Sequence, residues 1–191
     1  MKSEIWSKTL LKSYELLQYI EENIDKRVEI LAFSQTSIRY GNTTKQTCEK
    51  IISLIERKKQ ILHLHAQIDN MLDLIEKKYA TILKAKYVHN LSYEDIAKKI
   101  NVCERTVRRY IQYGIKQFTE VRNQNNFTDK DIINNYGKEP FLLNMYIKTM
   151  QNYLRVVGDK EYYKFYRKVI KHHQNNYQKI YNHNLVEKIP A

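Results

Sequence analysis

The stretch LSYEDIAKKINVCERTVRRYIQYGIKQF, residues 91–118, decides the fold of this chain. Ser92 followed by Asp95 is a capping-box pattern, which predicts that a helix begins there. Asn101 tolerates the left-handed conformation that a sharp turn between two helices needs. A second helix is expected to begin near Glu104. The stretch therefore predicts two short helices joined by a tight turn.

The two predicted helices each have an inward and an outward face. The inward faces should carry the apolar residues that recur at helical spacing, which are Ile96, Ala97, Ile100, Val107, Ile111 and Ile115. The outward face of the second helix should carry Arg105, Thr106, Arg108 and Arg109. A helix that is held by a small apolar face while it presents Arg, Thr and Glu is typical of a DNA recognition helix.

The charge of the chain agrees with a polyanionic partner. Its 191 residues carry a formal net charge of +12, and a strongly basic balance favours association with nucleic acid. A soluble basic protein with no such partner fits the charge equally well. The helix-turn-helix pattern, rather than the charge, is what favours DNA.

Composition and periodicity predict an all-α fold in three parts. Only four Gly and two Pro occur, and the apolar residues recur at helical rather than alternating spacing. We expect a long antiparallel helical hairpin or coiled coil over residues 1–77, a trihelical helix-turn-helix DNA-binding domain over 78–120, and a Tyr-rich helical extension over 127–185.

Two long amphipathic helices are expected in the first part, over residues 3–33 and from Thr44 onward, with a loop over 34–44. The apolar stripe of the first consists of Leu10, Tyr14, Leu17, Ile24, Val28 and Leu31. The stripe of the second consists of Cys48, Ile51, Ile52, Ile55, Ile61, Leu64, Ile68, Met71 and Ile75. Steps of three and four residues are typical of a coiled-coil seam, so the second helix could pack against the first or form a homodimer.

A short helix over residues 79–89, YATILKAKYVH, should supply the third wall of the trihelical unit. Two helices of a helix-turn-helix cannot bury their apolar faces alone, and this third helix closes their core.

Residues 80–118 resemble region 4 of the sigma-70 family, which reads the upstream promoter element. The segments KAKY, LSYEDIA and CERTVRR stand at matching spacing. Together with the helical segment before it, this part of the chain is similar to phage-encoded late-operon activators of the ArpU/RinA type. The resemblance implies a DNA-binding transcription regulator that could also contact RNA polymerase. The sequence departs from the family at Cys103, where Ser usually caps the recognition helix, and at Asn101, where Gly is commoner.

The predicted DNA-binding residues lie at the starts of the two helices. Arg105, Arg108 and Arg109 offer bidentate donors to guanine edges or to phosphates, Glu104 can accept from a cytosine amino group, and Thr106 can pack against a thymine methyl group. Ser92 and Tyr93 are expected to contact phosphates, and Cys103 opens the recognition helix.

The last part of the chain is expected to be helical throughout. Thr128 should cap a short helix through residue 135, Pro140 should open a longer one, and Asp159 should cap a final helix rich in Tyr and cations. That final helix fits an ordinary core, an oligomer or polymerase interface, or a platform for unpaired bases.

Several classes of protein are not expected. The sequence holds no Gly-rich phosphate loop, no nucleophile elbow and no carboxylate pair at useful spacing, so we expect neither an enzyme nor a cofactor. His63 and His65 project to different sides of a helix, and Cys48 and Cys103 lie far apart, so we expect no metal site and no disulfide. With no membrane span and no signal peptide, a cytoplasmic protein is expected.

These features predict a cytoplasmic, sequence-specific DNA-binding transcription regulator of phage or mobile-element origin. Its expected partners are double-stranded DNA, RNA polymerase and a second copy of the chain. The alternatives are a stand-alone alternative sigma factor, a small terminase-like or recombination accessory protein, and a plain protein-interaction module. The segment before Tyr79 lacks the aromatic and acidic signature of the promoter-melting module of sigma factors, which makes the first alternative secondary.

Overall fold

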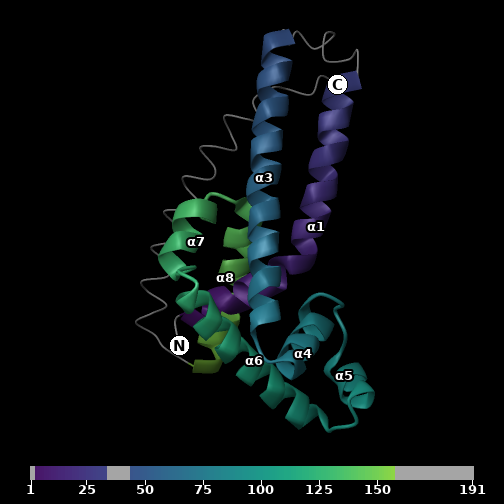
Figure 1. Ribbon diagram of the computed structural model, residues 1–191, viewed down its shortest axis with the longest axis vertical. Coiled ribbons are helices and arrows are strands. Elements are labelled where there is room, and N and C mark those ends of the chain that lie inside the picture. Colours follow the sequence, from purple (N-terminus) through teal and green to yellow (C-terminus); the bar gives the residue numbers. More distant parts are fainter. Residues whose placement is uncertain (1–2, 34–43, 158–191) are drawn as a thin grey trace. The chain divides into compact units, whose positions relative to one another are not determined.

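The computed structural model describes residues 3–33 and 44–157, and all of its regular elements in those ranges are helices (Figure 1). They are α1 (Ser3–Phe33), α3 (Thr44–Leu74), α4 (Lys77–Tyr87), α5 (Tyr93–Lys99), α6 (Glu104–Gln124), α7 (Asp129–Tyr136) and α8 (Pro140–Val157). The all-α prediction is confirmed. The expected loop over 34–44, apart from Thr44, which begins α3, lies outside the described residues, as does the expected Tyr-rich helix that begins at Asp159.

The chain divides into two compact units, Met1–Tyr146 and Ile147–Ala191, and the first unit holds helices α1 to α7 and the start of α8. The three-part division into 1–77, 78–120 and 127–185 stays a prediction.

Helices α1 and α3 form the expected antiparallel hairpin, and they lie side by side in Figure 1. Tyr14 donates a hydrogen bond of 2.7 Å to Asp69, while Asp25, further along α1, pairs with Lys58, earlier in α3, at 2.6 Å. The contact that lies later in α1 lies earlier in α3, as it must when two helices are antiparallel. The buried residues between and around them are Leu10, Leu17, Ile24, Ile61, Leu64 and Ile68.

Three residues in the first half of the predicted α3 stripe, Cys48, Ile52 and Ile55, do not face α1. Cys48 is exposed, and the side chains of Ile52 and Ile55 are 56% and 52% exposed. Ile51, which was predicted, and Leu54, which was not, are the partly buried apolar residues at this level of α3. Ile51 and Leu54 form one set of apolar residues at helical spacing, and Ile52 and Ile55 form a second set, shifted by one residue. Both sets have the same periodicity, so periodicity alone does not predict which set packs on α1.

Helix α1 packs against two different elements, because it changes direction along its length. In Figure 1 its N-terminal part crosses the lower end of α3 toward α6, and the rest runs along α3. Thr9 donates through its hydroxyl to the carbonyl of Ile5, and Ser13 donates to that of Leu10, both at 2.8 Å. Such bonds from Ser and Thr to a preceding turn bend helices.

Helices α4, α5 and α6 form the predicted trihelical unit. Their buried apolar residues are Ile82, Leu83, Ile96, Ala97, Val107, Ile111 and Ile115. Gly114 makes the contact between α4 and α6 close, because a Cβ atom there would lie 3.1 Å from the side chain of Leu83. Ile100, predicted to point inward, is 36% exposed, because α5 ends at Lys99 and Ile100 has already left the helical conformation.

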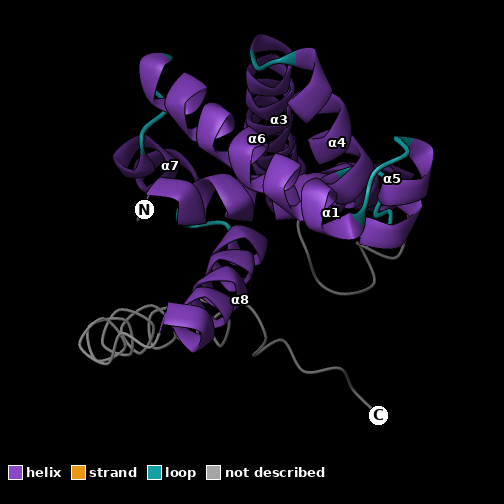
Figure 2. Cartoon of the chain, turned by 90° about the horizontal axis from the view of Figure 1, so that it is seen from below, coloured by secondary structure: helices purple, strands orange, loops and turns teal. Residues whose placement is uncertain are grey.

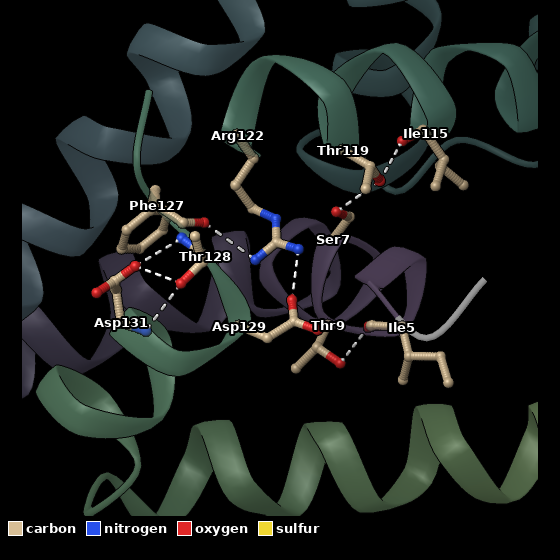
Figure 3. Close-up of polar contacts among 10 residues, drawn as sticks. All are labelled: Ile5, Ser7, Thr9, Ile115, Thr119, Arg122, Phe127, Thr128, Asp129 and Asp131. Atoms are coloured by element: carbon tan, nitrogen blue, oxygen red, sulfur yellow. Dashed lines mark hydrogen bonds and ion pairs between the residues drawn. The ribbon is translucent and has the colours of Figure 1, made fainter. Parts of the chain in front are cut away.

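Helix α6 is longer than expected, and contacts to neighbouring elements hold its C-terminal end in place (Figure 3). It continues to Gln124, beyond the predicted end of the trihelical domain at residue 120. Arg122, fully buried, donates to the carbonyl of Phe127 at 3.1 Å and pairs with Asp129 at 2.5 Å. One turn earlier, the hydroxyl groups of Thr119 and Ser7 are hydrogen-bonded at 2.7 Å, which ties α6 to α1.

The basic cluster of Arg57, Lys58 and Lys59 on α3 is largely paired inside the chain. Nε of Arg57 donates to both carboxylate oxygens of Glu139, which is nearly buried, and Nη2 donates to Oε2 at 2.9 Å. Lys58 pairs with Asp25. Only Lys59 is simply exposed. Arg57 thereby holds the start of α8 against α3.

Candidate nucleic-acid interface

The start of α5 is built as the sequence predicts. The backbone N–H of Asp95 donates to the Ser92 hydroxyl at 3.0 Å, and the backbone N–H of Ser92 donates to the Asp95 carboxylate at 3.3 Å. These two bonds complete the capping box. The hydrogen bonds from Ser92 hold the pKa of the Asp95 carboxyl below its usual range, which means that the cap favours the ionised carboxylate.

The turn between α5 and α6 also follows the prediction. Asn101 has a φ of 52°, in the left-handed region. Cys103 takes the N-cap position of α6 with extended backbone, but its side chain makes no capping hydrogen bond. Its thiol sulfur lies 3.2 Å from the hydroxyl of Thr106, and this contact lowers the pKa of the thiol. The recognition helix therefore starts without a side-chain cap, as expected for Cys at this position.

The outward face of α6 gathers most of the predicted DNA-binding residues. Arg105, Arg108 and Arg109 are exposed, and Thr106 is partly exposed. With Gln112 they line an open hollow of about 380 Å³. The opposite face of the helix is buried against α4 and α5, so the guanidinium groups all stand on the solvent side of one rigid element. In Figure 2, as in Figure 1, α5 and α7 lie at opposite ends of α6.

One of the three arginines is already engaged within the protein. The guanidinium of Arg108 lies 3.2 Å from the carboxylate of Glu104 and 4.2 Å above the ring of Tyr93. The ammonium of Lys86 lies 4.6 Å from the same ring and donates to the carbonyl of Leu91 at 2.9 Å. Among residues 3–33 and 44–157, Arg105 and Arg109 form no ion pair.

A second aromatic–cation contact borders the other side of this face. The ammonium of Lys78, in α4, lies 3.9 Å above the ring of Tyr110, in α6. Hydrogen bonding to Lys78 lowers the pKa of the Tyr110 hydroxyl. Helix α4 thus supplies the cation of one such contact, Lys78, and α5 supplies the aromatic ring of the other, Tyr93.

Three residues of this surface, Gln112, Lys116 and Lys78, were not among the predicted DNA-binding residues. Gln112 and Lys116 follow Arg105 and Arg109 at steps of three and four residues, so they continue the same helical stripe, and both are exposed. The exposure of these two residues could therefore have been predicted from their spacing. Lys78 could not be found in this way, because only the packing of α4 on α6 brings it to Tyr110.

Other kinds of site are not formed by the part of the chain that the structure describes. No group of His, Cys, Asp and Glu side chains there could hold a metal ion. His63 lies 2.6 Å from the hydroxyl of Tyr136 and His65 lies 3.0 Å from Glu21, so the two rings face different helices, as predicted. No described helix combines the length and the apolar character needed to cross a membrane.

Comparison with known proteins agrees with this geometry. No curated protein and no solved structure matches the chain. A family model described as sigma-70, region 4, matches residues 65–118, which run from the second half of α3 into α6. This match confirms the resemblance to region 4, while the finer resemblance to phage activators stays a prediction. The chain therefore carries a helix-turn-helix similar to region 4 of sigma-70 proteins.

Proposed function

We propose that this chain is a cytoplasmic, sequence-specific DNA-binding regulator of transcription, whose α6 enters the major groove. The observation that carries the proposal is the exposed row of Arg105, Arg109 and Gln112 on a helix whose other face is buried. Arg and Gln side chains are those that pair bidentately with guanine and adenine edges. The similarity of residues 65–118 to sigma-70 region 4 supports the same conclusion.

Each residue of the surface has a proposed role. Arg105 and Arg109, which form no ion pair with the described residues, read guanine edges, and Thr106 packs against a thymine methyl group. Arg108 reads a base or binds a phosphate, and Glu104 accepts from a cytosine amino group on the same side. Cys103 and the two residues at the start of α5, Ser92 and Tyr93, lie toward the phosphate backbone.

The proposed partners beyond DNA are RNA polymerase and a second copy of the chain. Region 4-like domains and a late-operon activator role imply the first. The exposed Ile52 and Ile55 on α3 favour the second, because apolar side chains at coiled-coil spacing are suited to a helix–helix contact. Origin in a phage or a mobile element is part of the same proposal.

A DNA-packaging or recombination accessory protein is the main rival, since such proteins also join a helix-turn-helix to helical oligomerisation segments. Light scattering separates the two. A monomer or dimer is expected for the regulator, whereas a ring of eight or more subunits would favour the packaging protein.

Selection of bound fragments from the native genome tests the function directly. Purified full-length chain is incubated with sheared genomic DNA at moderate salt, and the retained fragments are sequenced. A shared motif upstream of a gene cluster is expected. Recovery without any shared motif would contradict sequence-specific regulation, and enrichment at a packaging start would favour the rival.

A further inference from the structure

The ring of Tyr93, in α5, is contacted by side chains from the other two helices of the trihelical unit. Tyr93 is the first residue of α5, Lys86 approaches its ring from α4 at 4.6 Å, and Arg108 approaches from α6 at 4.2 Å. A cation over an aromatic face is attracted by the negative charge of the ring's π-system. The position of the Arg108 guanidinium is therefore linked to the packing of α4 and α5.

Arg108 is held from a second direction by its own helix. Glu104, one turn earlier, binds the guanidinium at 3.2 Å. The guanidinium has five N–H donors in a fixed fork, so a carboxylate on one edge and a ring on its face leave donors available. The Arg108 side chain is 57% exposed, and those donors can still be reached from outside.

Holding an arginine before DNA arrives has an energetic consequence. A long side chain loses much of its rotational freedom when it is ordered in a complex, and that cost opposes binding. For Arg108 part of this ordering is already present in the free protein. Arg105 forms no ion pair among the described residues and must still be ordered when it binds, whereas Arg109 interacts with the hydroxyl of Tyr110.

We propose that Tyr93 is a positioning residue for DNA recognition. Its ring, with Glu104, holds the guanidinium of Arg108 in the orientation in which it meets DNA. The role belongs to the ring and acts through Arg108, so it is separate from any contact of the Tyr93 hydroxyl with a phosphate. This inference rests on the proposed DNA-binding function and assigns sequence selectivity to a residue outside the recognition helix.

The test uses the full-length chain and two duplexes. One is selected by the wild-type chain from a random-sequence library, and the other has the same length and composition in scrambled order. Selectivity is the ratio of the two dissociation constants, measured by fluorescence anisotropy at one salt concentration. Tyr93→Phe keeps the ring and removes the hydroxyl, whereas Tyr93→Leu removes the ring and keeps apolar bulk.

Tyr93→Leu is expected to lower selectivity about two- to fivefold, the size of an exposed cation–π contact, and Tyr93→Phe to retain it. Arg108→Lys, which keeps the charge but not the planar group, should lose selectivity to a similar extent. In an Arg108→Ala background, Tyr93→Leu should have no further effect, because the two residues act as one unit. Circular dichroism and thermal melting establish that each variant is folded.

Three results would overturn the inference. Equal losses for Tyr93→Phe and Tyr93→Leu would assign the role to the hydroxyl. An undiminished effect of Tyr93→Leu in the Arg108→Ala background would show that Tyr93 does not act through Arg108. If the Tyr93→Leu variant does not fold, the Arg108→Lys variant provides the test. A selectivity for this variant equal to that of the wild-type chain would then contradict the inference. If the chain is not a sequence-specific DNA-binding protein, the wild-type chain would select no sequence from the library. That result is distinct from the three above.

Discussion

Arg122 and Asp129 form an ion pair of 2.5 Å in which the arginine side chain is completely buried and the carboxylate is about one-third exposed. The pair joins the last turns of the recognition helix α6 to the start of α7 (Figure 3). A buried charge that loses its partner is costly, because it can regain neither water nor another ion. The end of α6 that lies away from the arginine face is therefore the end that is anchored.

Asp129→Asn is expected to lower the free energy of unfolding by about 2 kcal/mol, because the buried guanidinium loses its ionic partner and keeps a weaker one. Urea denaturation followed by circular dichroism measures the change. Lys130→Gln is the matched control, since Lys130 is exposed on the same helix. Equal, small effects of the two substitutions would contradict the anchoring role of Asp129.

The two capping boxes make stability depend on pH in the acid range. Hydrogen bonds from Ser92 and Thr128 lower the pKa of Asp95 and Asp131 in the folded chain below the usual value of an aspartate carboxyl. A carboxyl with a lowered folded pKa contributes stability above its unfolded pKa and loses it as the pH falls through the folded pKa. The free energy of unfolding should therefore decrease below about pH 4.

This pH dependence is tested by comparison with the double variant Asp95→Asn, Asp131→Asn. Urea midpoints are measured at neutral pH and at several values below pH 4. We expect a shallower acid slope in the double variant, since two of the groups responsible for the slope are gone. An identical slope in both proteins would show that the capping carboxylates do not contribute.

Cys103→Ser should stabilise the chain. Cys103 has nearly the same extended backbone as the capping residue Ser92, with φ of −78° against −66°, yet its side chain makes no capping bond. A serine hydroxyl there can accept from the backbone N–H of Thr106, which is expected to raise the free energy of unfolding by about 1 kcal/mol. Cys48→Ser, on the exposed face of α3, should change it by less than about 0.5 kcal/mol. No gain at position 103 would contradict the missing-cap explanation.

Gly114→Leu tests the close approach of α4 and α6. A Cβ at this position already lies 3.1 Å from the Leu83 side chain and 3.2 Å from the Cβ of Tyr79. A larger side chain must separate the two helices, so we expect a loss of about 1–3 kcal/mol in the free energy of unfolding. Glu120→Leu, at an exposed position of the same helix, is the control. A Gly114→Leu variant as stable as this control would mean that the helices are not tightly packed here.

Features that depend on residues close together in the sequence could be predicted. The capping box at Ser92, the left-handed Asn101 and the bounds of α1 all follow from hydrogen-bonding groups or apolar residues close together in sequence. The arginine face of α6 was predictable for the same reason, since a helix with apolar residues every three or four positions must expose the residues between them.

Long-range contacts were not predictable in this way. Arg57 and Glu139 are 82 residues apart, and no periodicity indicates that one would pair with the other. The exposure of Ile52 and Ile55 depends on which of two neighbouring seams packs on α1. The contact of Tyr93 with Arg108 requires the crossing of α5 and α6, whereas the sequence showed only two separate polar residues.

The most direct test of DNA recognition compares the affinity of two triple variants for one duplex selected by the wild-type chain. The first, Arg105→Ala, Arg108→Ala, Arg109→Ala, removes the arginine face. The second, Lys45→Gln, Lys59→Gln, Lys130→Gln, removes three exposed cations elsewhere in the chain. Fluorescence anisotropy at moderate salt should show an affinity loss on the order of a hundredfold or more for the first, because each bidentate contact contributes to discrimination. Only a small loss is expected for the second. Equal affinities of the two variants would contradict the assignment of this surface to DNA.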